Sequence, residues 1–342
     1  MHNALSVEER VIGALAGLAI GDSMGMPTSF YTPEQIRYEF GKVDSFHPPA
    51  LAHQYHSGLR AGDVTDDTEQ SLALIRSFHR HRRVDPYDIA QELLAWSRRV
   101  EGKYVSPLGP STRRALEEIA NGTPVQEAGR TGDTNGAAMR ITPLGIVHGL
   151  RGSNIEELVS DVELACLPTH GTDIAISSAA AVAWAVAVCI QGATDTTQVI
   201  RAASEAAVLG RERGVKVVSP SVSRRLAWLI DSLSSNGSHE SRAQEIYDFI
   251  GAGMASAETV PAALGLFYIA EGDPREAILL ATNMGGDCDT TAAIAGAVAG
   301  AFAGQRAIPE NWIATIEQVN NLDLSGVAAE LIATAHAWHA AT

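Results

Sequence analysis

The amino-acid sequence predicts an all-α fold, because its composition and its hydrophobic spacing both favour helices. Hydrophobic residues make up 46% of the 342-residue chain, and alanine, the residue with the highest intrinsic helix propensity, is prominent among them. Apolar side chains recur at helical spacing, and no segment of four or more residues alternates strictly enough to predict a strand. The chain is long enough to bury a sizeable core and contains no Pro/Ser-rich linker. We therefore expect a single domain spanning residues 1–342.

The first predicted helix follows Ser6, which forms a capping-box pattern with Glu9. Its apolar positions continue at helical spacing, and we expect the helix to end near Gly21. A helix is predicted over 65–81, and another over 86–100 with Asp85 as its N-cap and proline at its first position. Further helices are predicted near residues 111–121, 153–166, 172–190, 195–209, 221–234, 241–250, 256–270, 274–282, 289–303, 309–319 and 325–339.

Residues 22–64 differ from the rest of the chain, because they carry Pro, Gly and His without sustained periodicity. This composition predicts an ordered loop on the surface, and long loops of compact domains are often functional. His47, His53 and His56 lie in this segment. Their irregular spacing favours a loop role over a metal site.

Charge and hydropathy exclude several classes of partner. The net charge of −15 would repel a phosphate backbone, so we expect no nucleic-acid partner. The longest apolar run, Ile174 to Ile190, is at the lower edge of the roughly 17–25 residues that span a bilayer, and its Ala and Ser content favours a buried core helix. The N-terminus lacks the basic region of a signal peptide. We expect a soluble, cytoplasmic, monomeric protein without a membrane partner.

Two acid clusters at predicted helix starts indicate a metal site. "DVTDDTEQ" (63–70) and "GGDCDTTA" (285–292) each present two aspartates with threonines. Capping a helix uses one acid, and burying further carboxylates without neutralisation costs several kcal/mol per charge. Hard divalent cations take carboxylate and hydroxyl oxygens, and two Mg²⁺ or Mn²⁺ ions would suit this number of carboxylates. The expected ligands are Thr65, Asp66, Asp67, Asp287, Asp289 and Thr290.

Three alternative types of acidic motif fit the two clusters less well. Neither cluster has the glycine and the glutamate that an EF-hand loop requires. The D-x-D motif of sugar-nucleotide transferases follows a strand, and the sequence predicts none. Prenyl and terpene synthases are all-α and carry D-D-x-x-D, but Gln70 stands at the fifth position and basic residues for a pyrophosphate are missing from both clusters.

The order of several motifs resembles the ADP-ribosylglycohydrolase family. The chain carries "GLAIGDSMG" (17–25), "TDDT" (65–68), "TNGAAMRITPLG" (134–145), "THGTDIAISSAAAVA" (169–183), "ETVPAAL" (258–264) and "NMGGDCDTTAAIAGAVAGA" (283–301). The resemblance extends from about residue 10 to 305. "GDxxG" alone is a weak signal, whereas "TDDT" combined with "GGDxDTxA" is highly specific.

The resemblance implies a compact orthogonal bundle of helices with a binuclear Mg²⁺ or Mn²⁺ centre. Carried over by position, the six residues of the acid clusters would bind the two ions. The centre would hold the ribose diol of an ADP-ribosyl group and cleave the bond at the anomeric carbon. Such a reaction passes through an oxocarbenium-like transition state, which carboxylates stabilise. We expect Asp66, Asp67 and Asp289 to take part in catalysis.

One position departs from the family pattern. Family members that cleave ADP-ribose from proteins typically carry Glu four residues after the second glycine of "GDxxG", where this chain has Ser29. Glu34, five residues further on, is a candidate replacement. The departure bears on the removal of ADP-ribose from proteins more than on hydrolysis itself.

Four further residues are predicted to contact the substrate. Asn135 precedes Gly136 and is either a ligand contact or a turn residue, and Asp133 lies two residues earlier. His170 is either a ligand contact or a satisfied histidine at a helix start. Tyr104 belongs to a polar segment marked by Gly and Pro, typical of a cleft lining.

We expect a glycohydrolase that acts on an ADP-ribosylated group, such as ADP-ribosyl-arginine or a related conjugate. A second interpretation keeps the site and takes a smaller substrate, a nucleoside or another ribosyl metabolite. A third is a non-enzymatic protein, either ADP-ribose-binding or similar to the lens crystallins among the family's relatives. Both acid clusters are intact in this chain, which favours an enzyme.

Overall fold

A computed structural model describes residues 5–102, 108–233 and 235–338, and it confirms the all-α fold within these ranges. The described residues form no β-strand, only the isolated bridges Tyr31–Gly286, Thr134–Ala255 and Thr172–Val215. In chain order the helices are α1 (Val7–Gly25), η1 (Met26–Thr28), α2 (Pro33–Phe40), α3 (Asp66–His81), α4 (Pro86–Val100), α5 (Pro110–Ala120), α6 (Val125–Ala128), α7 (Gly136–Met139), α8 (Thr142–Arg151), α9 (Ile155–Cys166), α10 (Asp173–Ile190), α11 (Thr196–Arg211), α12 (Val222–Asp231), α13 (His239–Ile250), α14 (Ser256–Ile269), α15 (Pro274–Met284), α16 (Cys288–Ala303), η2 (Gln305–Ala307), α17 (Glu310–Asn320) and α18 (Leu324–His336).

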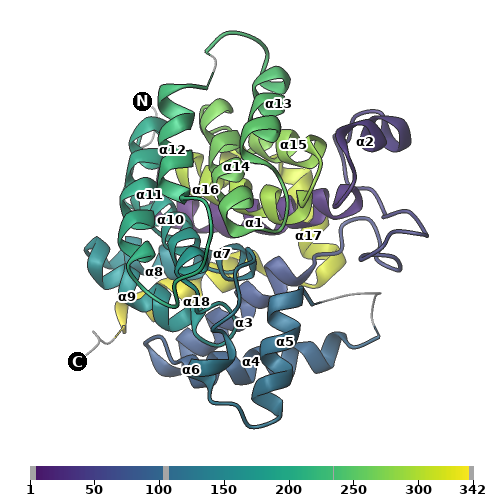
Figure 1. Ribbon diagram of the computed structural model, residues 1–342. Helices are drawn as coiled ribbons and strands as arrows, with labels where there is room; N and C mark the ends of the chain where they lie inside the picture. Colours follow the sequence, from purple (N-terminus) through teal and green to yellow (C-terminus); the bar gives the residue numbers. More distant parts are fainter. Residues whose placement is uncertain (1–4, 103–107, 234, 339–342) are drawn as a thin grey trace.

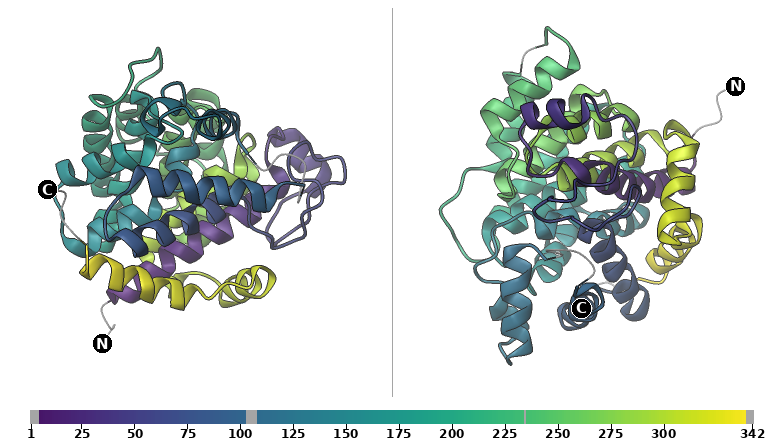
Figure 2. Two further views of the ribbon diagram at one scale, coloured as in Figure 1. Left: turned by 90° about the horizontal axis from the view of Figure 1, so that it is seen from below. Right: turned by 90° about the vertical axis from the view of Figure 1, so that its right-hand side faces the viewer.

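The helices run in several directions around a central α1, which Figure 1 shows crossing the middle of the molecule. Helices α4 to α6 lie below it in that view, and α12 and α13 lie above it. The left view of Figure 2 places α2 and the following loop at one edge of the molecule, and the right view shows them on the face turned toward the viewer. Most of the buried apolar side chains belong to one continuous cluster that extends from α1 to α18.

Most of the predicted helices are confirmed, and three predictions need correction. Helix α1 does not end near Gly21 but continues one turn to Gly25. Residues 33–40 form α2, which Thr32 and Gln35 cap reciprocally. Helix α8 was not predicted at all, because its two glycines weaken the helical pattern. A side chain at Gly145 or Gly149 would collide with the backbone of α10, so close packing explains both residues.

Helices α1 and α16 pack against each other with their backbones nearly in contact. Together they form the most extensive helix pair of the fold. A β-carbon added at Gly13, Gly17 or Gly21 would overlap with a backbone carbonyl oxygen of α16, and Gly296 and Gly300 of α16 show the same relation to α1. Small residues at every crossing point therefore let two apolar helices approach more closely than ordinary side chains permit.

Among the described residues, two helical segments are long and apolar enough to cross a membrane by length and composition. They are Val7–Thr28, whose most apolar stretch is entirely buried, and Asp173–Ile190, of which 89% is buried. Their apolar surface is covered by neighbouring helices, as in core helices of soluble proteins.

We predict that Gly17→Ala destabilises the protein strongly, because a methyl group would force the α1 and α16 backbones apart. Because backbone atoms have little room to move away from the added methyl group, we expect the free energy of unfolding to fall by about 3 kcal/mol. Urea unfolding of both proteins measures it. Gly109→Ala is the control, because Gly109 has a φ of −61° and open space around its α-carbon, and it should change stability by less than about 1 kcal/mol. Equal effects of the two substitutions would contradict the packing argument.

Candidate active site

The first turn of α3 is anchored by an aspartate from α1. Asp22 is fully buried, and its carboxylate accepts hydrogen bonds from the backbone N–H and hydroxyl groups of Thr65 and Thr68 at 2.5–3.1 Å. Thr65 is the N-cap of α3, but its own side chain does not cap the helix. Asp22 therefore satisfies N–H groups that the helix end leaves unpaired, and this anchor fixes Asp66 and Asp67 at the start of α3.

The two aspartates of α3 face the start of α16. Asp66 is half-buried and accepts a hydrogen bond from Gln70 Nε2 at 3.3 Å. Asp67 is 1% exposed, and its Oδ1 has no hydrogen-bond partner among the described residues. Its Oδ2 accepts a hydrogen bond from the Thr290 hydroxyl at 3.5 Å. This contact joins the two acid clusters, which are far apart in the sequence.

The second cluster opens α16 after a turn of two glycines. Gly285 and Gly286 have φ angles of 91° and 82°, a region that favours glycine. Asp287 is the N-cap of α16, yet its side chain makes no capping hydrogen bond. Its carboxylate instead accepts one from the Asn135 amide at 2.5 Å. Asp287 therefore serves something other than the helix end.

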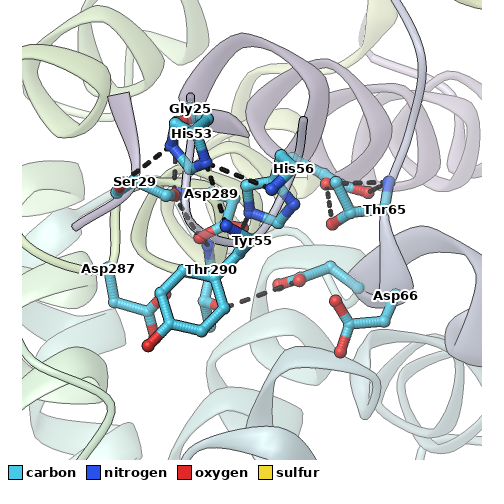
Figure 3. Close-up of polar contacts among 12 residues, drawn as sticks. Gly25, Ser29, His53, Tyr55, His56, Thr65, Asp66, Asp287, Asp289 and Thr290 are labelled. Atoms are coloured by element: carbon cyan, nitrogen blue, oxygen red, sulfur yellow. Dashed lines mark hydrogen bonds and ion pairs between the residues drawn. The ribbon is translucent and has the colours of Figure 1, made fainter. Parts of the chain in front are cut away.

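Asp289 is held by residues from the 22–64 segment. Its Oδ1 accepts hydrogen bonds from the Ser29 hydroxyl at 2.6 Å and from the Thr290 backbone N–H at 3.0 Å. Its Oδ2 lies 2.9 Å from His56 Nε2 (Figure 3). Ser29, at the position of the family glutamate, thus contacts the second acid cluster directly. Glu34 does not replace that glutamate, because its side chain is 73% exposed and pairs with Arg37.

Both clusters line a cavity of about 250 Å³. Phe30 and Tyr55 form part of its wall, with ring centroids 4.4 Å apart, and Figure 3 shows the Tyr55 ring in front of Thr290. The cavity is lined by Phe30, Tyr55, His56, Asp66, Leu108, Gly109, Pro110, Thr112, Arg113, Thr134, Asn135, Gly136, Met139, Met254, Asp287, Asp289 and Thr290. Three carboxylates thus share its walls with aromatic and apolar side chains.

Burial and mutual repulsion raise the pKa of most of these acids. Burial raises the pKa of Asp22 to about 6 and, together with the charges of Asp289 and Asp22, that of Asp66 to about 8. The pKa values of Asp67 and Asp287 also lie well above the ordinary range, with burial as the main cause. Asp289 is the exception. Burial opposes its ionisation, but the hydrogen bond and charge of His56 outweigh burial and lower its pKa.

The donor set fits a hard divalent cation. Carboxylates and threonine hydroxyls crowd one site, and the buried Asp67 Oδ1 lacks a partner among the described residues; such oxygens are the ligands that Mg²⁺ and Mn²⁺ prefer. In the present side-chain conformations, no three His, Cys, Asp or Glu side chains of the described chain form a group that could hold a metal ion. Asp289 and Asp287 are instead engaged by protein donors. A cation would have to draw the carboxylates together.

The six predicted metal ligands lie close together, although not all of them line the cavity. Asp66, Asp287, Asp289 and Thr290 line it, while Asp67 lies behind Thr290. The hydroxyl of Thr65 is directed to Asp22 at 2.5 Å. Metal binding by these residues stays a prediction.

The predicted substrate contacts are distributed differently. Asn135 lines the cavity, but its amide nitrogen donates to Asp287 and to Thr259. His170 is fully buried and does not line the cavity; it lies behind Thr134, 3.0 Å from the Thr134 hydroxyl. Asp133 is exposed and also lies outside the cavity lining. The prediction for Tyr104 falls outside the described residues.

Sequence reasoning missed several residues of this site. Asp22 received no role of its own within the "GLAIGDSMG" motif, although a lone acid inside an apolar helix is a signal of a buried partner. Ser29 was noted as a departure without its contact to Asp289, and His56 was assigned a loop role. The contacts of His56 and Tyr55 come from an irregular loop, so no spacing rule could have found them.

Comparisons with known proteins agree with this architecture. A family model described as ADP-ribosylglycohydrolase matches residues 3–341. The uncharacterised protein YegU of Escherichia coli K12 is 34% identical, over 94% of this chain and 96% of its own length. The ADP-ribosylarginine hydrolase Tri1 of Serratia proteamaculans is 26% identical, over 92% of this chain and 78% of its own. A solved structure of an ADP-ribosylglycohydrolase-related protein complex superposes with a TM-score of 0.72 at 28% identity, covering 96% of this chain and 99% of that chain.

We predict that the chelator-treated protein loses stability as the pH rises from 7 to 8.5. In the folded state Asp66 has a pKa of about 8, and those of Asp67 and Asp287 are raised well above the ordinary value. The folded protein therefore binds more protons than the unfolded chain, and each such carboxyl costs up to about 1.4 kcal/mol of stability per pH unit until the pH passes its folded pKa. The lowered pKa values of His53 and His170 act in the opposite direction, but mainly below pH 7.

Thermal unfolding midpoints in chelator over this pH range measure the effect. Asp67→Asn should raise the midpoint at pH 8.5 and flatten the decline, because it removes one buried acid. Asp88→Asn is the matched control, since Arg80 and other hydrogen-bonding partners keep the pKa of Asp88 low despite its partial burial. It should leave the slope unchanged. A midpoint that stays constant or rises toward pH 8.5 would contradict the prediction.

Proposed function

The chain belongs to the ADP-ribosylglycohydrolase family, and on that premise we propose that it cleaves ADP-ribosyl-arginine or a closely related conjugate in the cytoplasm. Members of this family are hydrolases that act on ribosyl glycosidic bonds. The observation that carries the finer proposal is the junction of the two acid clusters at one cavity. Carboxylates at that junction suit a reaction in which positive charge develops on a ribosyl ring.

The leaving group is proposed from the acids and the aromatic faces of the cavity. Asp66, Asp287 and Asp289 belong to its lining residues, Arg113 and His56 are the lining side chains that can carry positive charge, and aromatic faces form part of one wall. Asp289 is ionised, an approaching cation favours the ionised form of the other two acids, and aromatic faces also attract a planar cation. A guanidinium already carries its positive charge while it is bonded to ribose, so it leaves as a neutral guanidine. The Serratia relative is named for hydrolysis of ADP-ribosylarginine, which agrees with this choice.

The reaction needs water at the anomeric carbon and stabilisation of the ring. Water adds to that carbon, the bond to the guanidine nitrogen breaks, and the proton that water loses ends on the departing guanidine. Asp289 has a lowered pKa and is ionised, so its negative charge stabilises the positive charge that develops on the ribosyl ring. We assign to Asp66, which lines the cavity, the orientation of the water and, in its ionised form, the acceptance of the water's proton. Asp67 lies behind Thr290 and accepts a hydrogen bond from its hydroxyl, so we assign to it the positioning of Thr290.

We further propose that the site binds two Mg²⁺ or Mn²⁺ ions. Thr65, Asp66, Asp67, Asp287, Asp289 and Thr290 would hold them, because these residues supply the clustered oxygen donors. When bound, such ions fix ribose hydroxyls and lower the pKa of a water molecule.

A second candidate substrate is a nucleoside or another small ribosyl compound. The cavity of about 250 Å³ is smaller than the roughly 300–1,000 Å³ typical of ligand pockets. A ribosyl group with a small leaving group requires less space than a complete ADP-ribosyl group.

The test is turnover of a substrate panel in the presence of Mn²⁺ or Mg²⁺. ADP-ribosyl-arginine, ADP-ribosyl-serine and common nucleosides are incubated with the protein, and released ribosyl product is followed by mass. We expect turnover of ADP-ribosyl-arginine, and a loss of at least about 100-fold in kcat/KM in Asp289→Asn, which removes the ionised carboxylate. Glu34→Gln is the control, because Glu34 is exposed and pairs with Arg37; it should retain full activity.

Turnover of nucleosides alone would select the second candidate. Turnover of ADP-ribosyl-arginine that survives Asp289→Asn would contradict the assignment of the acid clusters.

A further inference from the structure

Four residues form a closed ring of contacts beside the cavity. The Ser29 carbonyl contacts His53, His53 contacts His56, His56 contacts Asp289, and Asp289 returns to the Ser29 hydroxyl. Figure 3 shows this ring, which we call the Ser29–Asp289 ring. It joins the irregular loop of residues 41–62 to the start of α16.

The hydrogen bonds of His53 determine its tautomer. Its Nδ1 accepts hydrogen bonds from the backbone N–H groups of Tyr55 and His56 at 3.3 and 3.1 Å. The proton is therefore on Nε2, which donates to the Ser29 carbonyl at 3.0 Å. Burial and the neighbouring His56 lower the pKa of His53 to about 4, so the imidazole stays neutral near pH 7.

Ring stacking then sets the orientation of His56. The His53 ring is stacked on Tyr31, with centroids 5.5 Å apart, and on His56, with centroids 5.1 Å apart. His56 is 4% exposed, and its Nε2 donates to Asp289 Oδ2, because an ionised carboxylate can only accept. The orientation of His56 is thus fixed by stacking on His53, which is itself stacked on Tyr31, and by the hydrogen bond from the His56 backbone N–H to His53 Nδ1.

The orientation of His56 determines which acceptor positions of Asp289 are occupied. Oδ1 accepts from Ser29 and from the Thr290 backbone, which uses both of its lone pairs. Oδ2 accepts from His56, and the Asp287 carboxyl, while it holds its proton, also hydrogen-bonds to Asp289. A cation bound between the two acids would replace that proton and take up the acceptor position that His56 and Ser29 leave open. Protein donors on one side of a carboxylate commonly orient its remaining oxygen position toward a metal.

We propose that His56 is a positioning residue of the active centre, which together with Ser29 fixes Asp289 so that Oδ2 is available to a divalent cation. This inference rests on the proposed function, because it assumes that Asp289 is a cation ligand. It assigns to the 41–62 loop a part in the chemistry of the site. It also explains why a serine is suitable at position 29, since Ser29 is fully buried and its hydroxyl and carbonyl bind the two ends of the ring.

The test is calorimetric titration of Mn²⁺ into the chelator-treated full-length protein. His56→Leu should weaken Mn²⁺ binding by about tenfold or more, the usual effect of losing a hydrogen-bond partner of a ligand. His56→Gln retains an N–H donor and should restore most of the affinity. If His56 only filled space, His56→Leu would bind Mn²⁺ as tightly as the wild type.

Two further variants keep the test decisive. Ser29→Ala removes one hydroxyl without changing the loop histidines, and it should also weaken Mn²⁺ binding even if His56→Leu fails to fold. His47→Leu is the matched control, because His47 lies in the same loop, contacts Phe40 and Ser45, and does not line the cavity. It should bind Mn²⁺ as the wild type does.

The outcomes separate the two proposals. Wild-type Mn²⁺ binding with unchanged or tighter affinity in His56→Leu and Ser29→Ala overturns the role of the ring and leaves the proposed function intact. Absence of Mn²⁺ binding by the wild type overturns both the inference and the cation part of the proposed function. In that case, turnover of ADP-ribosyl-arginine in chelator would show whether the hydrolase proposal itself survives.

Discussion

The backbone contact between α1 and α16 is the constraint on which the site depends. Glycines at successive turns of α1 lie against carbonyl groups of α16, so both helices keep one register along their length. Asp22 belongs to the last turns of α1, and Gly25 lies against Cys288, directly before Asp289. Because Asp22 also anchors α3 through Thr65 and Thr68, one helix crossing sets the positions of both acid clusters. The close packing of small residues between these helices therefore fixes the positions of the carboxylates.

This fixed arrangement brings together carboxylates that repel one another. Buried carboxylates with raised pKa values are costly to ionise without a compensating cation, and a site of this kind persists only when the surrounding packing over-determines it. Asp289 differs from its neighbours because His56 and Ser29 stabilise its charge. The cluster thus contains one carboxylate that is prepared as an anion and several that hold protons until another positive charge arrives. This asymmetry is what a glycohydrolase requires, since one acid must be ionised before the ribosyl ring develops its charge.

The parts of the structure that could be predicted from sequence are those with local causes. Helix starts at Ser6 and Asp85 followed from their capping residues, and the two acid clusters stood out because each contains more acids than a cap uses. Helix α8 was missed because Gly145 and Gly149 are accounted for only by contact with α10. The role of His56 could not be predicted, because its partner Asp289 is distant in the sequence and the loop that carries His56 has no periodicity. Local patterns identify the reacting groups, whereas long-range contacts decide which of them is ionised.

The helices and the loop segment also differ in how they can determine substrate specificity. The helices supply the carboxylates, and their positions follow from packing that tolerates little change. The segment from Ser29 to His56 contributes Phe30, Tyr55 and His56 to the cavity wall, and its backbone is attached to the α16 turn through the Phe30 and Tyr31 contacts with Gly286. A segment that is attached to the helices through its backbone, here and at Val43, can vary in the side chains it presents without disturbing the helix crossing. We therefore expect the ribosyl chemistry to depend on the helices together with Ser29 and His56, which hold Asp289, and the choice of leaving group to depend on Phe30 and Tyr55, which the same segment presents to the cavity.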